Sequence, residues 1–146
     1  MRGKRSMQDI QITKPTFKKC EAEWFNYHKT LKEINLLEES ILHPYKEVDE
    51  NIGGGQSNIP GDPVGSTTIR LTRHKQLNYL REIASAIETV YNELPKDYKR
   101  LVQVRYWSTN GLTWNMIAKK VNISARQGQR WRDEIVIATV EVLGWR

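Results

Sequence analysis

The sequence predicts an all-α protein. Apolar residues recur at spacings of three and four over most of the chain, and no stretch alternates apolar and polar residues convincingly with a period of two. The 146 residues, 38% of them hydrophobic, suffice for one compact domain or two small ones. We expect a helical N-terminal region that contains a long Gly/Pro-containing loop, followed by a helix-turn-helix domain at residues 94–146.

The first expected helix covers residues 16–42, after a basic N-terminal tail at residues 1–15. Its apolar stripe consists of Trp24, Tyr27, Leu31, Ile34, Leu37 and Ile41. Pro44 ends this helix, because proline cannot continue the hydrogen-bonding pattern. Trp24, Phe25 and Tyr27 are expected in the core rather than in a surface platform for base stacking.

The segment 43–66 breaks the helical periodicity with a run of glycines at 53–55 and prolines at 60 and 63. Its 24 residues exceed an ordinary connection in a compact domain, so we interpret it as a partly mobile linker or a functional loop. A second amphipathic helix is expected at 68–92, with Leu77, Leu80, Ala84, Ile87 and Tyr91 on one side. We expect the region 16–93 to serve oligomerisation or partner contact, because narrow apolar stripes are buried by packing together or against a second copy.

A further helix should begin at Leu94-Pro95, because proline suits a first helical position and Asp97 suits the positive end of the helix dipole. Its expected buried residues are Tyr98, Leu101, Val102 and Tyr106. The sequence STNG at 108–111 is expected to form a turn.

Residues 112–135, LTWNMIAKKVNISARQGQRWRDEI, fit the steric requirements of a helix-turn-helix. Ala118 is small where the second helix crosses the first, and Ile117 and Val121 flank it on the inward side. Asn122 occupies the turn position that needs a left-handed backbone, which asparagine tolerates best after glycine. Ile123 is the buried anchor of the turn. Thr113 and Ser124 are the expected N-caps of the two helices.

The second motif helix, residues 124–143, should face inward through Gly128, Trp131, Ile135 and Ala138. A branched aliphatic residue is more common at the position of Gly128, and Trp131 is larger than usual one turn later. We expect the indole of Trp131 to fill the volume that the glycine leaves. This would offset a helix-propensity cost of about 1 kcal/mol.

The opposite face of that helix carries planar hydrogen-bonding groups, which suit base edges in the major groove of double-stranded DNA. The candidate base-reading residues are Arg126, Gln127, Gln129, Arg130 and Asp133. The candidate phosphate contacts are Thr113, Lys119, Lys120, Ser124 and Arg132. A helical hairpin with solvated polar residues would explain the charge. It would not explain why Ala118, Asn122, Ile123 and Ser124 stand at the offsets that the motif requires.

The charge distribution supports a nucleic-acid partner. Residues 1–19 carry a net charge of +5, residues 20–94 carry −5, and residues 95–135 carry +6. A localised basic segment is the electrostatic footprint of a phosphate-binding surface. For the first 19 residues a solvated, disordered tail remains an equal alternative.

Other functional classes lack their signatures. His28, His43 and His74 are scattered, and no metal-ligand spacing, cofactor motif or nucleophile–base pair stands out, so we expect no metal, no cofactor and no enzyme. Neither a signal peptide nor an apolar run of about 20 residues is present, so we expect no membrane association. The single cysteine, Cys20, is consistent with a reducing cytoplasm.

Residues 94–144 resemble the sigma-factor domain that reads the upstream promoter element. The matching features are Leu94-Pro95, Arg105-Tyr106, Gly111-Leu112-Thr113, Ile117-Ala118 and Ile123-Ser124. The chain is not a complete sigma factor, because nothing upstream looks like the domain that melts promoter DNA. This resemblance makes host RNA polymerase a further candidate partner.

A longer resemblance starts with NYHK at 26–29 and NIGG at 51–54, followed by a second helix and the sigma-like C-terminal motif. This order is similar to the phage late-gene regulators of the RinA/ArpU type. The resemblance implies a phage or prophage protein that activates late structural and packaging genes in the cytoplasm of a Gram-positive host. The alternative is a small terminase-type DNA-packaging protein, which would also pair a helix-turn-helix with an oligomerising helical region.

A homo-oligomer, most simply a dimer, is also expected. The last helix is apolar nearly all round, and such a helix packs on more than one side. A dimer also doubles the DNA contacts across two half-sites.

Overall fold

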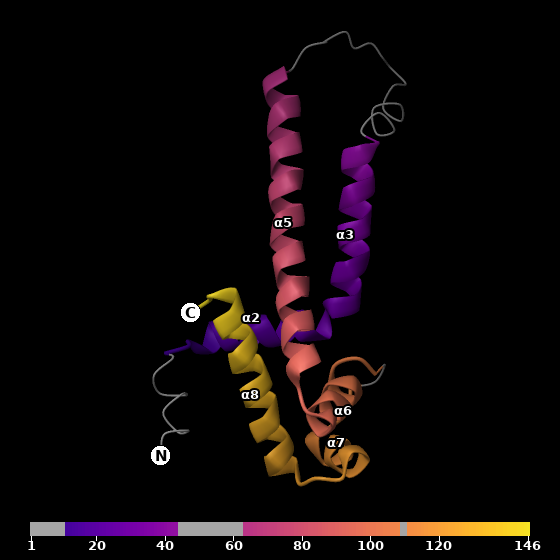
Figure 1. Ribbon diagram of the computed structural model, residues 1–146, viewed down its shortest axis with the longest axis vertical. Helices are drawn as coiled ribbons and strands as arrows, with labels where there is room; N and C mark the ends of the chain where they lie inside the picture. Colours follow the sequence, from indigo (N-terminus) through magenta and orange to yellow (C-terminus); the bar gives the residue numbers. More distant parts are fainter. Residues whose placement is uncertain (1–10, 44–62, 109–110) are drawn as a thin grey trace. The chain divides into compact units, whose positions relative to one another are not determined.

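The computed structural model describes residues 11–43, 63–108 and 111–146, and over these ranges the chain forms helices and no strands (Figure 1). The helices are α2 (Lys14–Phe25), α3 (Tyr27–Leu42), α5 (Pro63–Glu93), α6 (Lys96–Arg105), α7 (Trp114–Val121) and α8 (Ala125–Leu143). The prediction of an all-α protein is confirmed for this part of the chain.

The chain divides into two compact units. One unit combines Met1–Tyr27 with Ser85–Arg146, and the other consists of His28–Ala84. In the first unit α2 and α8, which are far apart in sequence, pack against each other (Figure 1). A boundary at residue 94 would therefore cut through a compact unit, and the structural unit that contains the helix-turn-helix is larger than the range 94–146.

The expected single helix at 16–42 is interrupted at Asn26, where the backbone has φ −92° and ψ 6°. The N–H of Asn26 points to the carbonyls of Ala22 and Trp24, and the Trp24 carbonyl also accepts a hydrogen bond from the indole of Trp107 at 3.1 Å. The interruption thus coincides with a contact to a residue 83 positions away, which no local pattern signals.

Three other boundaries differ from expectation. Helix α2 begins at Lys14, with Thr13 as its N-cap, so its first two residues lie inside the expected tail. Residues 1–10 of that tail lie outside the described part. Helix α5 begins at Pro63 rather than at 68, so the expected loop ends earlier, and residues 44–62 also lie outside the described part. Of the expected turn at 108–111, residues 109–110 are not described.

In the His28–Ala84 unit, α3 and the first part of α5 carry the two predicted stripes. Leu31, Ile34, Leu37 and Ile41 are half-buried, whereas Leu77 and Ala84 are buried and Leu80 is half-buried. Arg81 pairs with Glu38 at 2.5 Å. Larger apolar side chains are exposed at Leu36, Leu42, Ile69, Leu71 and Tyr79. Self-association through this unit remains a prediction.

The core of the other unit is centred on the predicted face of α6 and on α8. Leu101, Val102 and Tyr106 of this α6 face are buried, while Tyr98 is half-buried. The fully enclosed Trp24 of α2 donates its indole N–H to Thr139 Oγ1 of α8 at 3.0 Å. The Thr139 hydroxyl in turn donates to the carbonyl of Ile135 at 2.8 Å. This chain of bonds satisfies two buried polar groups and fixes α2 on α8.

Candidate nucleic-acid interface

The turn between α7 and α8 has the geometry that the sequence predicts. Thr113 caps α7 by accepting a hydrogen bond from the Met116 N–H, and Asn122 adopts a left-handed conformation with φ 67° and ψ 47°. The N–H groups of Asn122 and Ile123 both point to the carbonyl of Ala118. The second of these bonds spans six residues, as in a Schellman motif, and it turns the chain sharply out of α7.

The crossing of α7 and α8 is tightly packed. Ile117, Ala118 and Gly128 are buried. Val121 and Ile123 are half-buried on either side of the turn. The small side chains let the two helices approach closely, so the polar face of α8 is held at a fixed orientation.

The partner of Gly128 differs from the sequence-based expectation. A Cβ atom at Gly128 would lie 3.1 Å from Cζ3 of Trp114 and 3.5 Å from Cδ1 of Ile123. Trp131 is half-buried and stacks on Tyr98 of α6, with ring centroids 4.4 Å apart. The prediction that Trp131 compensates for the glycine is therefore wrong, and Trp114 occupies the space beside it.

The inward face of α8 is also wider than predicted. Ile135 is buried as expected, but Ala138 is half-buried, and the face extends to Val136, Thr139 and Val140. The reason is that α8 packs against α7 on one side and against α2 on another. A prediction made from the motif alone takes the packing against α7 into account but not the packing against α2.

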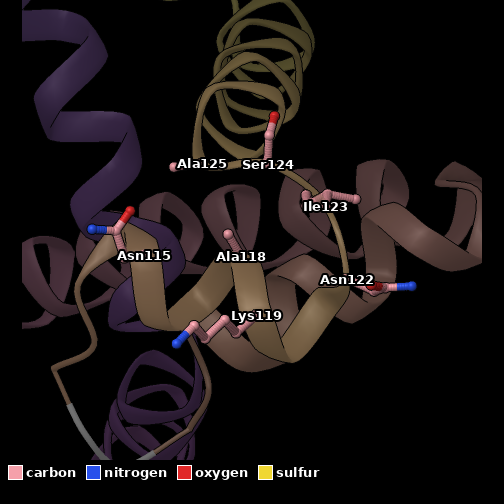
Figure 2. Close-up of a pocket in the computed structure, with 7 residues that line it drawn as sticks. All are labelled: Asn115, Ala118, Lys119, Asn122, Ile123, Ser124 and Ala125. Carbon is pink, nitrogen blue, oxygen red and sulfur yellow. The ribbon is translucent and has the colours of Figure 1, made fainter.

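A groove of about 620 Å³ opens where α7, the turn and the start of α8 meet. Figure 2 shows Asn115 and Lys119 extending toward one side of this groove and Asn122 toward the other. The first turn of α8 lies at its edge, where Ser124 accepts a hydrogen bond from the Gln127 N–H at 3.0 Å. The start of a helix carries free N–H groups and a partial positive charge, so this edge suits an anionic oxygen such as a phosphate.

Most of the predicted DNA contacts lie on accessible surface. Arg126, Gln129 and Arg130 are exposed, and Gln127 is half-buried. The spacing of the three exposed residues places them on one face of α8. On the neighbouring surface Thr113, Lys119, Lys120 and Ser124 are exposed.

Arg132 and Asp133 are placed differently from these exposed residues. The side chain of Arg132 is 19% exposed, and its Nε donates to Asp133 Oδ1 at 2.6 Å. Its Nη1 donates to Glu21 Oε2 at 3.2 Å. Arg132 is thus held inside the protein by two carboxylates rather than directed at a phosphate, while the side chain of Asp133 remains 37% exposed.

Sequence reasoning missed the role of Glu21. Its Oε2 accepts hydrogen bonds from the Tyr106 hydroxyl at 2.7 Å, from Nε and Nη2 of Arg105 at 3.1 and 2.9 Å, and from Arg132. Burial alone would raise the pKa of Glu21, but these bonds and the two guanidinium charges outweigh it and hold the pKa below its usual value. The sequence does contain a signal for this role. Glu21 stands four residues after Phe17 and three before Trp24, so it shares their face of the helix. A carboxylate on such an apolar face needs hydrogen-bonding or charged partners.

Three further findings concern metal binding, membrane spans and the single cysteine. Among the residues that the structure describes, no group of three His, Cys, Asp or Glu side chains could hold a metal ion. The helices in the same ranges are all too short or too polar to cross a membrane. Cys20 is buried, and burial, reinforced by the nearby charges of Glu23 and Glu21, raises its pKa to about 12.

These features define an all-α protein in which α7 and α8 cross closely at a tight turn and α8 presents an exposed polar face. Residues 24–140 match the family described as "Protein of unknown function (DUF722)", and the chain belongs to this family. It is also 27% identical over 132 residues to "Transcriptional activator rinA" of Staphylococcus phage phi11, covering 88% of this chain and 91% of the relative. This similarity confirms the resemblance to RinA-type regulators, and no solved structure matches the chain.

Proposed function

We propose that the protein is a sequence-specific DNA-binding transcriptional activator of phage late genes. In this proposal α8 enters the major groove, and the protein acts as a dimer in the cytoplasm of its bacterial host, without a cofactor or an enzymatic activity. The observation that carries the proposal is the face of α8 that exposes Arg126, Gln129 and Arg130, in a chain whose relative is a transcriptional activator. We call this surface the reading face.

The chemistry of the reading face supports base recognition. Arg126 and Arg130 each present a planar guanidinium that can donate two hydrogen bonds to guanine O6 and N7. Gln129, on the same face, can pair with adenine N6 and N7. All three lie near the start of α8, and the N-terminal part of such a helix contacts base edges when it docks.

The surface around the reading face supports phosphate binding. Lys119 and Lys120 lie in the last turn of α7 and are exposed. The capped starts of α7, at Thr113, and of α8, at Ser124, add backbone donors. Such contacts would hold the protein in register on the duplex without reading its sequence.

Binding-site selection from a randomised duplex library, with the purified full-length protein, tests base reading. Arg126→Ala, Gln129→Ala and Arg130→Ala should each lose about 1–3 kcal/mol of specific binding and relax the preference at one or two base pairs. The matched comparison is Lys119→Ala with Lys120→Ala, which should weaken binding to all sequences alike and flatten its salt dependence. Unchanged selectivity after all three α8 substitutions would refute base reading.

A role in DNA packaging, as in a small terminase-type protein, is the competing function. Chromatin immunoprecipitation in the native host, together with measurement of promoter output, separates the two. An activator should occupy sites upstream of late genes, and their transcription should fall when α8 is altered. Occupancy at packaging sites with unchanged transcription would favour the packaging role.

A further inference from the structure

We propose that Glu21 is a positioning residue for base recognition, which acts through Arg132 to fix the carboxylate of Asp133 on the reading side of α8. This inference rests on the proposed DNA-binding function. It assigns part of the specificity to α2, a helix that lies about a hundred residues before the motif in sequence.

The side chains of Glu21, Arg132 and Asp133 connect α2 to the reading side of α8. Arg132 uses two different nitrogens, Nε toward Asp133 at 2.6 Å and Nη1 toward Glu21 at 3.2 Å, so its guanidinium bridges the two carboxylates. Glu21 is itself fixed, because Tyr106 and Arg105 of the α6 segment also donate to it. The carboxylate of Asp133 is therefore connected to both α2 and α6.

The rings of Phe17 and Trp114 also pack against the guanidinium of Arg132. Its central carbon lies 5.4 Å from the ring centre of Trp114 and 5.5 Å from that of Phe17. The Trp114 ring also lies beside Gly128 of α8. Arg132 is thus confined between α2, α7 and its own helix, and it presents a fixed donor to Asp133.

This arrangement leaves Asp133 able to accept a further hydrogen bond. Arg132 donates to Oδ1 of Asp133, and within the described residues no group donates a hydrogen bond to Oδ2. The side chain is 37% exposed, on the same helix as Arg126 and Arg130. A carboxylate in such a position can accept from the amino group of cytosine. Fixing its orientation before binding reduces the ordering cost of that contact.

A purely structural role for Glu21 makes a different prediction. If Glu21 only docks α2, its loss should weaken binding to every duplex by the same factor, through a smaller folded population. If it positions Asp133, its loss should reduce discrimination at the base pair that Asp133 reads. The effect should also vanish when Asp133 has been replaced.

The test uses the full-length protein and the duplex chosen by binding-site selection. Dissociation constants are measured for that duplex and for its single-base-pair variants with the wild type, Glu21→Gln, Asp133→Asn and the double variant. Glu21→Gln should lower discrimination by about 3- to 10-fold at the position where Asp133→Asn loses it, and it should have no further effect in the Asp133→Asn background. Arg132→Lys, which keeps the charge but lacks the planar guanidinium whose separate nitrogens reach Asp133 and Glu21, should give the same loss.

Glu134→Gln is the matched control. It makes the same charge change next to Asp133 and removes a carboxylate that accepts from Tyr98 at 2.7 Å, but it lies outside the connection to Glu21. It should leave discrimination unchanged. Equal weakening of all duplexes by Glu21→Gln and Arg132→Lys, or full selectivity in Asp133→Asn, would overturn the inference while base reading by Arg126 and Arg130 survived. Absence of any sequence preference in the wild type would overturn both this inference and the proposed function.

Discussion

Gly128 offers a sharp test of how the two motif helices meet. A Cβ atom at this position would contact Cζ3 of Trp114 at 3.1 Å and Cε3 at 3.4 Å. Gly128→Ala gains about 1 kcal/mol of helix propensity, and the half-buried ring must move by only a few tenths of an ångström. The two effects nearly cancel, so we expect the free energy of unfolding to stay within about 1 kcal/mol of wild type.

Gly128→Val should behave differently. Its two Cγ atoms extend beyond the position where Cβ already touches Trp114, and Ile123 Cδ1 stands 3.5 Å away. We expect an overpacking cost of about 2–3 kcal/mol, and because of its β-branching valine recovers only part of the helix propensity that alanine gains. Urea unfolding of the full-length protein, followed by circular dichroism, measures this difference.

A double-mutant cycle identifies the ring responsible. Trp114→Leu removes the atoms that the new side chain would meet, so Gly128→Val should cost about 1–2 kcal/mol less in that background. The matched variant Trp131→Leu removes a ring that stacks on Tyr98 and should leave the cost of Gly128→Val unchanged. Relief by Trp131→Leu and not by Trp114→Leu would refute the packing described here.

Three further predictions concern the supports of α8. Ser124→Ala removes the cap on Gln127 and should lower the free energy of unfolding by about 1 kcal/mol in urea titrations; no change would mean that the cap is dispensable. Trp24→Phe removes the buried donor to Thr139 and should cost about 1–3 kcal/mol in the same assay, and a silent substitution would contradict the docking of α2 on α8. Because the pKa of Glu21 lies below the ordinary value of 4.5, its stabilising effect is complete above that pH and is lost as the pH falls through the folded-state pKa. Glu21→Gln should therefore flatten the acid side of the melting-temperature profile, and an unchanged profile would argue against the ion pairs.

The geometry of α7, the turn and the start of α8 could be predicted closely because its signals are local. Thr113 and Ser124 cap helices through the backbone of residues three positions away, and Asn122 turns the chain within one residue. The burial of Ile117 and Ala118 follows from spacing alone. Each of these features depends on atoms that are neighbours in sequence, so offsets carry the information.

The failed predictions involve contacts between distant residues. The interruption at Asn26 coincides with a hydrogen bond from Trp107, and the width of the buried α8 face reflects the packing of α2 on α8. The ring beside Gly128 belongs to Trp114 of the preceding helix, because α7 crosses α8 at this point. A helical wheel drawn for α8 alone shows Trp131 but not Trp114, so it suggests the wrong partner.

The position of α2 links these errors to function. Trp24 fixes α2 on the C-terminal part of α8 through Thr139, and Glu21 fixes it nearer the start of α8 through Arg132. Because these two bonds lie one helical turn apart on α2, they restrain both the rotation of α8 and the direction of its polar face. Replacing Glu21 should therefore lower DNA selectivity, whereas replacing Trp24, which docks α2 on α8, should weaken binding to every duplex alike. In the proposed function, the sequence needed for DNA binding therefore includes α2, although every residue proposed to touch a base lies in α8.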